Sequence, residues 1–368
     1  MRIGITGQAG FVGEHLTNYL SLQKNVELIS FKKSFFEKNE DLEKFVTSCD
    51  TIVHLAAMNR HSNPQVIYDT NIKLVNKIIY ACESQNVKPT IFFSSSTQET
   101  SDNLYGKSKL EGGKLFEDWG RKSGARIVNM VIPNVFGPFG KPNYNSVVAT
   151  FCHKLTHGEI PQISNDSLLK LVYINELIED IFQLIFSDQS GKVSIKHRHE
   201  MLVSELNKKL TSFKISYLDN GKIPEINDPL SLALFNTYRC YIDYDHYPVL
   251  FAKHTDDRGS FVEIIRANTS GQFSFSTTKP SITRGNHFHT RKAERFAVIK
   301  GKAKISLRKI GTQKVIDYII DGESPAYVDM PIWYTHNITN IGEQELITLF
   351  WINEPYDQKD PDTYFVNV

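Results

Sequence analysis

Four residues in the last third of the chain are of types that bind divalent metals. His287 and His289 are one residue apart in "HFHTRKAERFAVIKG", and Glu294 follows five residues later. Alternate residues of a strand project from the same face, and a carboxylate across the next turn can complete three ligands. His336 in "MPIWYTHNITN" would supply a fourth. The spacing predicts a metal site, and this mixture of ligands suits zinc, iron, manganese or nickel.

The amino-terminal segment "MRIGITGQAGFVGEHL" indicates a different site, for a nucleotide. Gly7, Gly10 and Gly13 follow an apolar strand directly, and we expect a helix to begin near Phe11. Glycines let the backbone approach a pyrophosphate closely, and a helix N-terminus offers unpaired N–H groups to its oxygens. The pattern therefore predicts a dinucleotide-binding turn.

The end of the second expected strand bears on the choice of cofactor. A carboxylate there would bind the ribose 2′-hydroxyl and repel a 2′-phosphate. The chain instead reads "SFKK", which ends in Lys32 and Lys33. The absence of an acid and the two cations favour NADPH over NADH, unless these lysines are ordinary surface charges.

A tyrosine and a lysine stand four residues apart in "LYGKSK". On a helix, Tyr105 and Lys109 would share one face. A free tyrosine titrates near ~10, and a neighbouring ammonium lowers that pKa, so the pair can transfer protons. The expected strand "IFFSSST" ends eight residues before Tyr105 and offers hydroxyls from Ser95, Ser96 and Thr97 at the edge of the sheet.

Composition limits the classes of protein that remain. A formal net charge of +1 over 368 residues argues against a nucleic-acid binder, and it favours a small-molecule partner. The 4 cysteines are scattered, which indicates reduced thiols rather than disulfides. Because no secretion signal or long apolar run is evident, we expect a cytoplasmic protein without membrane insertion.

The elements that must position these residues fall into two classes. Through residues 1–245, apolar runs such as "RIGIT" and "TIVHLAA" alternate with amphipathic stretches, which predicts an α/β Rossmann-type, doubly wound parallel sheet. Residues 190–240 are read as helical, with little support from their pattern. Residues 246–368 consist of short alternating segments between turns, which predicts an all-β domain.

The first domain resembles the extended short-chain dehydrogenase/reductase family, which acts on nucleotide sugars. The resemblance runs from Met1 to about residue 240 and includes "TGQAGFVG", "DTIVHLAA", "SSST", "YGKSK" and "PNVFGP" in the family's order. It implies that Tyr105 exchanges a proton with the substrate oxygen, while Lys109 holds the nicotinamide ribose and tunes Tyr105. Ser96 is preferred as the serine that binds the same oxygen, with Ser95 and Thr97 as alternatives.

The same motifs place the cofactor. The predicted cofactor-binding residues are Gly7, Gly10, Phe11, Val12, Gly13, Lys32, Lys33, Leu55, Ala56, Ala57 and Lys109.

The second domain resembles the cupins, which have a jelly-roll fold. The two cupin motifs match between Ser281 and Asn340, and the match carries metal coordination over to His287, His289, Glu294 and His336. One departure is Trp333, which occupies a position where the motif usually has glycine.

A further resemblance lies in "DDRGSFVEI" and "GQFSFSTTKPSITRGNHFH". Both segments look like the signature of the nucleotide-sugar 3,5-epimerases of the cupin superfamily. The likeness implies substrate contacts from Arg258, Phe261, Glu263 and Arg284. That family ordinarily works without a metal, so the metal-ligand set is a departure from it.

The order of the two domains resembles capsular polysaccharide synthesis enzymes that join a reductase to a metal cupin. The resemblance implies a cupin that epimerises C3 of UDP-2-acetamido-2,6-dideoxy-hexos-4-ulose. The reductase would then use NADPH to make UDP-2-acetamido-2,6-dideoxy-L-talose, on the route to UDP-N-acetyl-L-fucosamine. It also implies zinc and a homodimer held through the cupin domains.

Several alternatives stay open at this stage. The chain would be a plain 4-ketoreductase if its metal were only structural, or a non-catalytic NADPH sensor, although the intact Tyr105–Lys109 pair argues against a sensor. A cupin dioxygenase is a weaker alternative. The base at C3 is open among Lys302, Tyr334 and Glu263.

Overall fold

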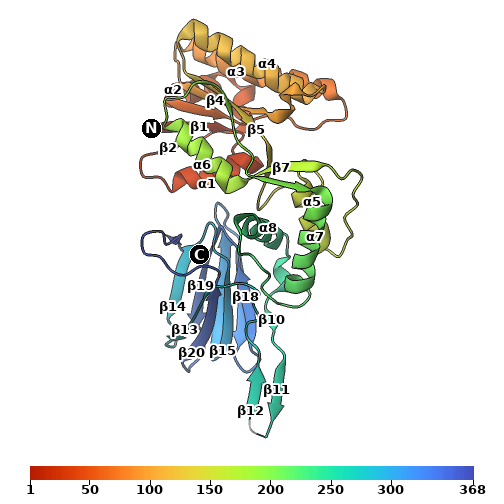
Figure 1. The fold of residues 1–368 in the computed structure, drawn as a ribbon. Coiled ribbons are helices and arrows are strands. Elements are labelled where there is room, and N and C mark those ends of the chain that lie inside the picture. The colour runs from red at the N-terminus through yellow and green to blue at the C-terminus, as the bar shows by residue number, and fades with distance from the viewer. Residues whose placement is uncertain (258) are drawn as a thin grey trace. The chain divides into compact units, whose positions relative to one another are not determined.

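The computed structural model describes residues 1–257 and 259–368, which divide into two compact units (Figure 1). Unit 1 comprises Met1–Val147 and Asn165–Val203, and unit 2 comprises Val148–Ser164 and Ser204–Val368. Neither unit is one continuous stretch. The division into domains at residue 245 stays a prediction.

Unit 1 is built on six parallel strands in the order β2-β1-β3-β4-β5-β8. They are β1 Arg2–Thr6, β2 Glu27–Ile29, β3 Thr51–His54, β4 Thr90–Ser96, β5 Ile127–Ile132 and β8 Gly191–Ser194. All residues of β3 and β5 are buried, because helices cover both faces of such a sheet. The strand order reverses at β1, so the ends of β1 and β3 border the crevice where such sheets bind ligands.

The helices of unit 1 lie on the two faces of this sheet, with α3 beside α4 and α1 beside α6 (Figure 1). They are α1 Phe11–Ser21, η1 Lys33–Glu37, α2 Asn39–Ser48, α3 Pro64–Ser84, η2 Thr97–Thr100, α4 Leu104–Ser123 and α6 Ile174–Ile185. A smaller sheet contains β6 Asn134–Phe136, β7 Leu168–Tyr173 and β9 His199–Leu202. Asn103 caps α4 by accepting the N–H of Gly106 at 2.7 Å, and this cap fixes where the helix of Tyr105 begins.

Unit 2 contains two antiparallel sheets of five strands, ordered β10-β18-β15-β20-β13 and β17-β16-β19-β14-β21. The first consists of β10 Val249–Leu250, β13 Gln272–Thr278, β15 Glu294–Lys300, β18 Ala326–Met330 and β20 Leu346–Ile352. The second consists of β14 Thr283–Phe288, β16 Lys302–Lys309, β17 Val315–Asp321, β19 Tyr334–Asn340 and β21 Tyr364–Phe365.

The remaining elements of unit 2 are a hairpin and several helices. The hairpin, β11 Lys253–Asp256 with β12 Gly259–Val262, pairs with neither five-stranded sheet. The helices are α5 Val147–Thr156, α7 Val203–Phe213, η3 Lys214–Leu218, α8 Pro229–Arg239 and η4 Tyr244–His246.

The predicted fold classes, a parallel α/β sheet followed by an antiparallel β domain, are confirmed. The helical reading of residues 190–240 is only partly right, because this stretch also contains β8 and β9. Among the described residues, no helix combines the length and apolar character needed to cross a membrane.

Candidate functional site

The glycine turn joins β1 to α1 as closely as glycine permits. Gly7 has φ +79°, a left-handed conformation, and its carbonyl accepts the N–H of Gly10 at 2.9 Å. A Cβ at Gly13 would lie 2.1 Å from the carbonyl oxygen of Gly7. Gly10 is the N-cap of α1 and has no side chain, so Phe11 and Val12 begin a helix whose N-terminus is uncapped. This backbone cradle fits a dinucleotide pyrophosphate.

The residues after β3 lie against the same turn. Leu55 and Ala56 donate their N–H groups to the carbonyl and the hydroxyl of Thr6, at 3.2 and 3.3 Å. A Cβ on Gly7 would come within 2.9 Å of the Ala56 nitrogen, so the two segments are in contact. The structure therefore brings "LAA", which includes Ala57, to the crevice beside the glycine turn.

The two predicted cofactor lysines follow β2. Lys32 and Lys33 are exposed, and they begin η1. Gln8, in the glycine turn, accepts the N–H of Phe31 at 3.3 Å and so joins the two loops. Both cations are thus held near the expected cofactor path and are open to a phosphate.

Tyr105 and Lys109 occupy consecutive turns of α4, with the Lys109 nitrogen 5.8 Å from the centre of the Tyr105 ring. Lys109 is buried and donates to the carbonyl of Ser94 at 2.8 Å. Burial lowers the pKa of Lys109 to about 7. Burial, with a smaller effect of Tyr144, raises the pKa of Tyr105 to about 12. The Lys109 ammonium therefore does not bring the Tyr105 pKa below its ordinary value in the cofactor-free protein, where burial raises that pKa.

The hydroxyls at the end of β4 have different partners. Ser95 is buried and donates to Glu99 at 2.6 Å, and Glu99 also pairs with Lys192. Ser96 is half-buried, and its hydroxyl accepts the N–H of Gln98 at 3.2 Å. That bond leaves the Ser96 hydroxyl able to donate to a substrate oxygen, whereas the Ser95 hydrogen is already used.

The four predicted metal ligands converge in unit 2. The candidate ligand atoms of His287, His289, Glu294 and His336 all lie within 4.8 Å of one another. Nε2 of His289 and Nε2 of His336 are 3.1 and 3.3 Å from the same Glu294 oxygen. These three atoms are buried and make no hydrogen bond to any described residue. Such a set of buried, converging donors fits a divalent metal.

The pKa shifts of two of these residues, His287 and Glu294, agree with a metal site. Burial, followed by the neighbouring His336 and His289, lowers the pKa of His287 to about 4, so its imidazole is neutral at neutral pH. Burial opposes ionisation of Glu294, but the neighbouring His289 and His336 lower its pKa overall. The neutral imidazole of His287 and the ionised carboxylate of Glu294 are the forms that bind metal.

Two irregularities of the backbone lie beside these ligands and affect their direction. The register between β14 and β19 shifts between Gly285 and His287, a bulge that redirects the strand beside the first ligand. Trp333, where the cupin motif usually has glycine, adopts the left-handed φ of +62°. The strained conformation persists because the Trp333 ring is buried and stacks on Phe288. The backbone N–H of Trp333 also donates to the His289 carbonyl at 2.8 Å.

Comparison with known proteins bears on both units. Residues 3–193 match the NAD dependent epimerase/dehydratase family, and residues 254–364 match the polysaccharide biosynthesis C-terminal domain. The chain is 34% identical over 371 residues to the UDP-2-acetamido-2,6-beta-L-arabino-hexul-4-ose reductase of Pseudomonas aeruginosa, covering 100% of this chain and 99% of that protein. The chain belongs to the NAD dependent epimerase/dehydratase family.

Solved structures extend this family assignment to the whole chain. The capsular polysaccharide assembling protein CapF of Staphylococcus aureus matches with a TM-score of 0.64 and 35% identity, over 100% of both chains. The UDP-glucose 4-epimerase of Thermotoga maritima matches with a TM-score of 0.55 and 20% identity, over 66% of this chain and 98% of that one, which shows the shared fold. The resemblance to enzymes that join a reductase to a cupin is confirmed: the chain is a CapF-like member of its family.

The predicted substrate contacts are less closely gathered. Arg258 lies outside the described residues. Phe261 is 69% exposed on the β11–β12 hairpin, and Glu263 is paired with Arg266. Arg284 is exposed on β14, three residues before the first metal ligand. Substrate binding by these residues stays a prediction.

Two of the three candidate bases at C3 already have partners. A hydrogen bond from Arg266 lowers the pKa of Glu263 and weakens it as a base. The Tyr334 hydroxyl lies 2.7 Å from that of Tyr244, and burial raises its pKa. Lys302, on β16, is exposed.

Tyr144 was not among the predicted site residues, and it is near enough to affect the Tyr105 pKa. The side chains of Arg60 and Lys141 lie 5.7 and 5.2 Å from the centre of the Tyr144 ring. Neither cation was among the predicted site residues, and the three-dimensional arrangement brings both to Tyr144.

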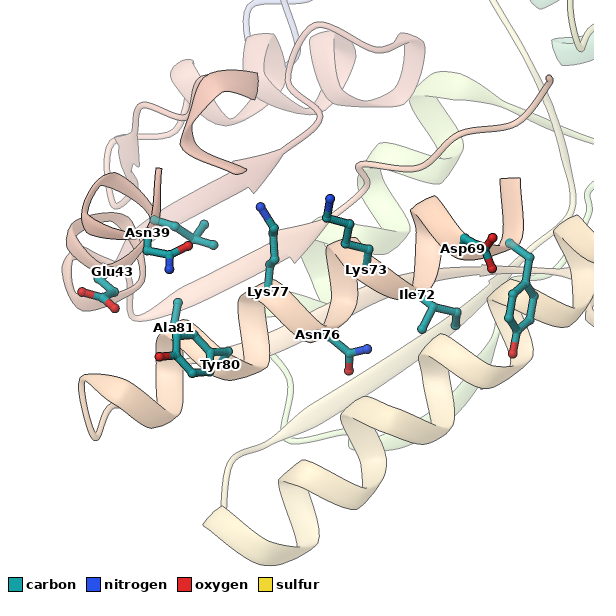
Figure 2. A pocket seen from close by; sticks show the side chains of 11 residues that line it. Asn39, Glu43, Asp69, Ile72, Lys73, Asn76, Lys77, Tyr80 and Ala81 are labelled. Atoms are coloured by element: carbon teal, nitrogen blue, oxygen red, sulfur yellow. The ribbon is translucent and has the colours of Figure 1, made fainter. Parts of the chain in front are cut away.

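One groove of unit 1 lies apart from these residues. It has a volume of about 470 Å³ and is lined from α2 and α3 by residues such as Glu43, Lys73, Lys77 and Tyr80 (Figure 2). None of the predicted site residues lines it. The groove is therefore separate from the glycine turn and the Tyr105–Lys109 pair.

Proposed function

We propose that the protein is a bifunctional nucleotide-sugar enzyme of capsule or O-antigen polysaccharide synthesis. Unit 2 inverts C3 of UDP-2-acetamido-2,6-dideoxy-hexos-4-ulose. Unit 1 then reduces the C4 ketone with NADPH to UDP-2-acetamido-2,6-dideoxy-L-talose, on the route to UDP-N-acetyl-L-fucosamine. The full-length similarity to a reductase of such a 4-keto sugar supports the substrate class.

The observation that carries the proposal is the convergence of the four ligand atoms within 4.8 Å, in a chain that keeps Tyr105 and Lys109 on one helix. A ketone at C4 explains why both sites are needed. It accepts a hydride, and it also makes the neighbouring C3 hydrogen acidic.

Reduction uses the residues of unit 1. The glycine turn would hold NADPH, with Lys32 and Lys33 available to its 2′-phosphate, and the cofactor would supply the hydride for C4. Tyr105 is protonated at neutral pH, because its pKa is about 12, so its phenol can donate the proton that O4 requires. Ser96 donates a hydrogen bond to the same oxygen, and Lys109 supports Tyr105 and the nicotinamide ribose.

Epimerisation uses the residues of unit 2. His287, His289, Glu294 and His336 would hold a divalent metal, which we propose is zinc, and this metal supplies Lewis acidity that stabilises negative charge on O4. Removal of the C3 proton by a base, followed by protonation from the opposite face, inverts C3. Epimerisation must precede reduction, because the alcohol product has no carbonyl to acidify C3.

The product of each variant tests the division of labour. Wild-type protein with the 4-keto sugar and NADPH should yield a C4 alcohol inverted at C3, identified by NMR coupling constants. His289→Ala should still oxidise NADPH on this ketone but leave C3 uninverted. If folded His289→Ala gives the same C3-inverted product at the wild-type rate, the cluster has no part in epimerisation.

A further inference from the structure

Residues 360–366, which we call the clasp, lie against the strands that carry the metal ligands. Within the clasp, β21 pairs with β14, and Phe365 stands opposite His287. The hydroxyl of Thr335, the neighbour of His336, donates to the carbonyl of Val366. The clasp therefore contacts two ligand-bearing strands that are distant from it in sequence.

Asp362 joins the clasp to a third part of the site. It is only 3% exposed. Its carboxylate accepts the N–H groups of Thr290 at 3.0 and 3.2 Å, Arg291 at 3.0 Å and Lys292 at 3.2 Å, and the Thr290 hydroxyl at 2.7 Å. These three residues form the connection between the second and third predicted ligands. One carboxylate thus fixes the turn that sets their separation.

The backbone of Asp362 acts on a ligand directly. Nδ1 of His289 is hydrogen-bonded to the Asp362 carbonyl. Because a carbonyl only accepts, Nδ1 must carry the hydrogen, and Nε2 keeps its lone pair. Nε2 is the His289 atom that lies 3.1 Å from Glu294, inside the cluster. The bond therefore selects the tautomer that can bind metal.

The conformation of Asp362 allows both contacts. Its φ is +42°, a backbone region that aspartate tolerates better than most residues. Flanking contacts hold the segment, since Arg291 pairs with Asp360 at 2.8 Å and the Lys292 ammonium donates to the Pro361 carbonyl at 2.8 Å.

We infer that Asp362 is a positioning residue of the metal site, and that the clasp holds His289 in the tautomer and orientation needed to bind a divalent cation. The inference rests on the proposed metal site. Asp362→Ala keeps the backbone carbonyl but removes the carboxylate that ties the clasp to residues 290–292. Loss of such an outer contact typically weakens metal binding by about 10–100-fold.

The test uses full-length protein stripped of metal and titrated with Co²⁺ against a competing chelator. Wild type is compared with Asp362→Ala, Asp362→Asn and His289→Ala, and with Asp357→Ala as an exposed control in the preceding segment. The visible absorption of Co²⁺ reports ligand geometry, and circular dichroism reports folding. We expect Asp362→Ala to bind Co²⁺ about 10–100-fold more weakly with an altered spectrum, Asp362→Asn to recover part of the loss, and Asp357→Ala to match wild type.

The outcomes separate this inference from the proposed function. If His289→Ala loses Co²⁺ while both folded Asp362 variants keep wild-type affinity and spectrum, the role of the clasp is refuted and the metal site stands. If His289→Ala binds Co²⁺ as tightly as wild type, the metal site itself is refuted. Asp362→Asn keeps the size and the preferred backbone of aspartate, so it decides the question if Asp362→Ala does not fold.

Discussion

At the residue scale, burial decides the protonation of Tyr105. The Lys109 ammonium is directed at the Ser94 carbonyl, and burial lowers its own pKa to about 7. Burial, with a smaller effect of Tyr144, raises the Tyr105 pKa to about 12. A protonated phenol is the form needed when a ketone is reduced, so the cofactor-free protein is already in the donor state.

Tyr105→Phe removes only the phenolic oxygen. We expect NADPH oxidation on the 4-keto sugar to fall by roughly 10²–10⁴-fold, because O4 loses its proton donor. Exchange of the C3 hydrogen should persist, since it takes place in unit 2. Absorbance at the NADPH band measures the first activity and NMR the second. Loss of both activities in a folded Tyr105→Phe variant would show that the two reactions are not separate.

Lys109→Met tests the buried cation through stability. Lys109 has a pKa of about 7 in the folded cofactor-free protein, against an ordinary value near 10.5. Between these two pH values the lysine is protonated in the unfolded chain and neutral in the folded protein. Stability from this group therefore rises with pH from about 7 to 10.5. In urea unfolding, the free energy of unfolding of Lys109→Met should exceed that of wild type by the largest amount at pH 7. This difference should become smaller towards pH 10. Lys114→Met, exposed on the same helix, should show no such trend. If the free energies of unfolding of wild type and Lys109→Met differ by the same amount at every pH, burial does not lower the pKa of Lys109.

At the element scale, the nucleotide turn was predictable because everything that defines it is local. The glycines, the strand before them and the helix after them are neighbours in sequence, and the structure gives Gly7 the conformation that glycine is needed for. The metal ligands were predictable for a related reason, since residue alternation on strands gives their directions. The bulge beside His287 was not predictable, because it depends on the register between two strands. The contact of Asp362 with His289 was not predictable either, because it joins residues more than 70 positions apart.

Gly13→Ala tests the cradle. A methyl group there would meet the Gly7 carbonyl and push α1 away from the turn. Overpacking of this kind costs about 1–3 kcal/mol, so NADPH affinity should fall by roughly tenfold or more. Fluorescence titration measures the affinity, and Asn18→Ala in the same helix serves as the control. Unchanged NADPH binding by Gly13→Ala would argue against a pyrophosphate at this turn.

At the scale of the whole molecule, the fold classes followed from hydrophobic periodicity, which changes where the β domain begins. Hydrophobic periodicity did not predict which segments of the chain belong to each compact unit. Segments 148–164 and 204–245 precede the β domain in sequence but group with it in contacts. Helical periodicity shows that such segments have a face to bury, and it does not show which partner they bury it against.

The homodimer proposed through the cupin domains has a candidate surface. Strand β13 is at the edge of its sheet, and its alternate residues Phe273 and Phe275 are 59% and 70% exposed. Large exposed aromatics on an edge strand mark an interaction site. Sedimentation should show a dimer for wild type and a monomer for the Phe273→Glu, Phe275→Glu double variant. Tyr80→Glu, at a 60% exposed tyrosine of unit 1, should remain dimeric. A double variant that stays dimeric would place the interface elsewhere.

The most direct test of the proposed function is hydrogen exchange at C3 without NADPH. The protein is incubated in deuterated water with the UDP-linked 4-keto-6-deoxy-N-acetylhexosamine, and C3 is followed by NMR against a sample without protein. We predict protein-dependent deuterium at C3 that disappears on chelation and in His289→Ala. If C3 keeps its proton while added NADPH is still consumed, the protein is a plain ketoreductase and the histidine cluster is structural.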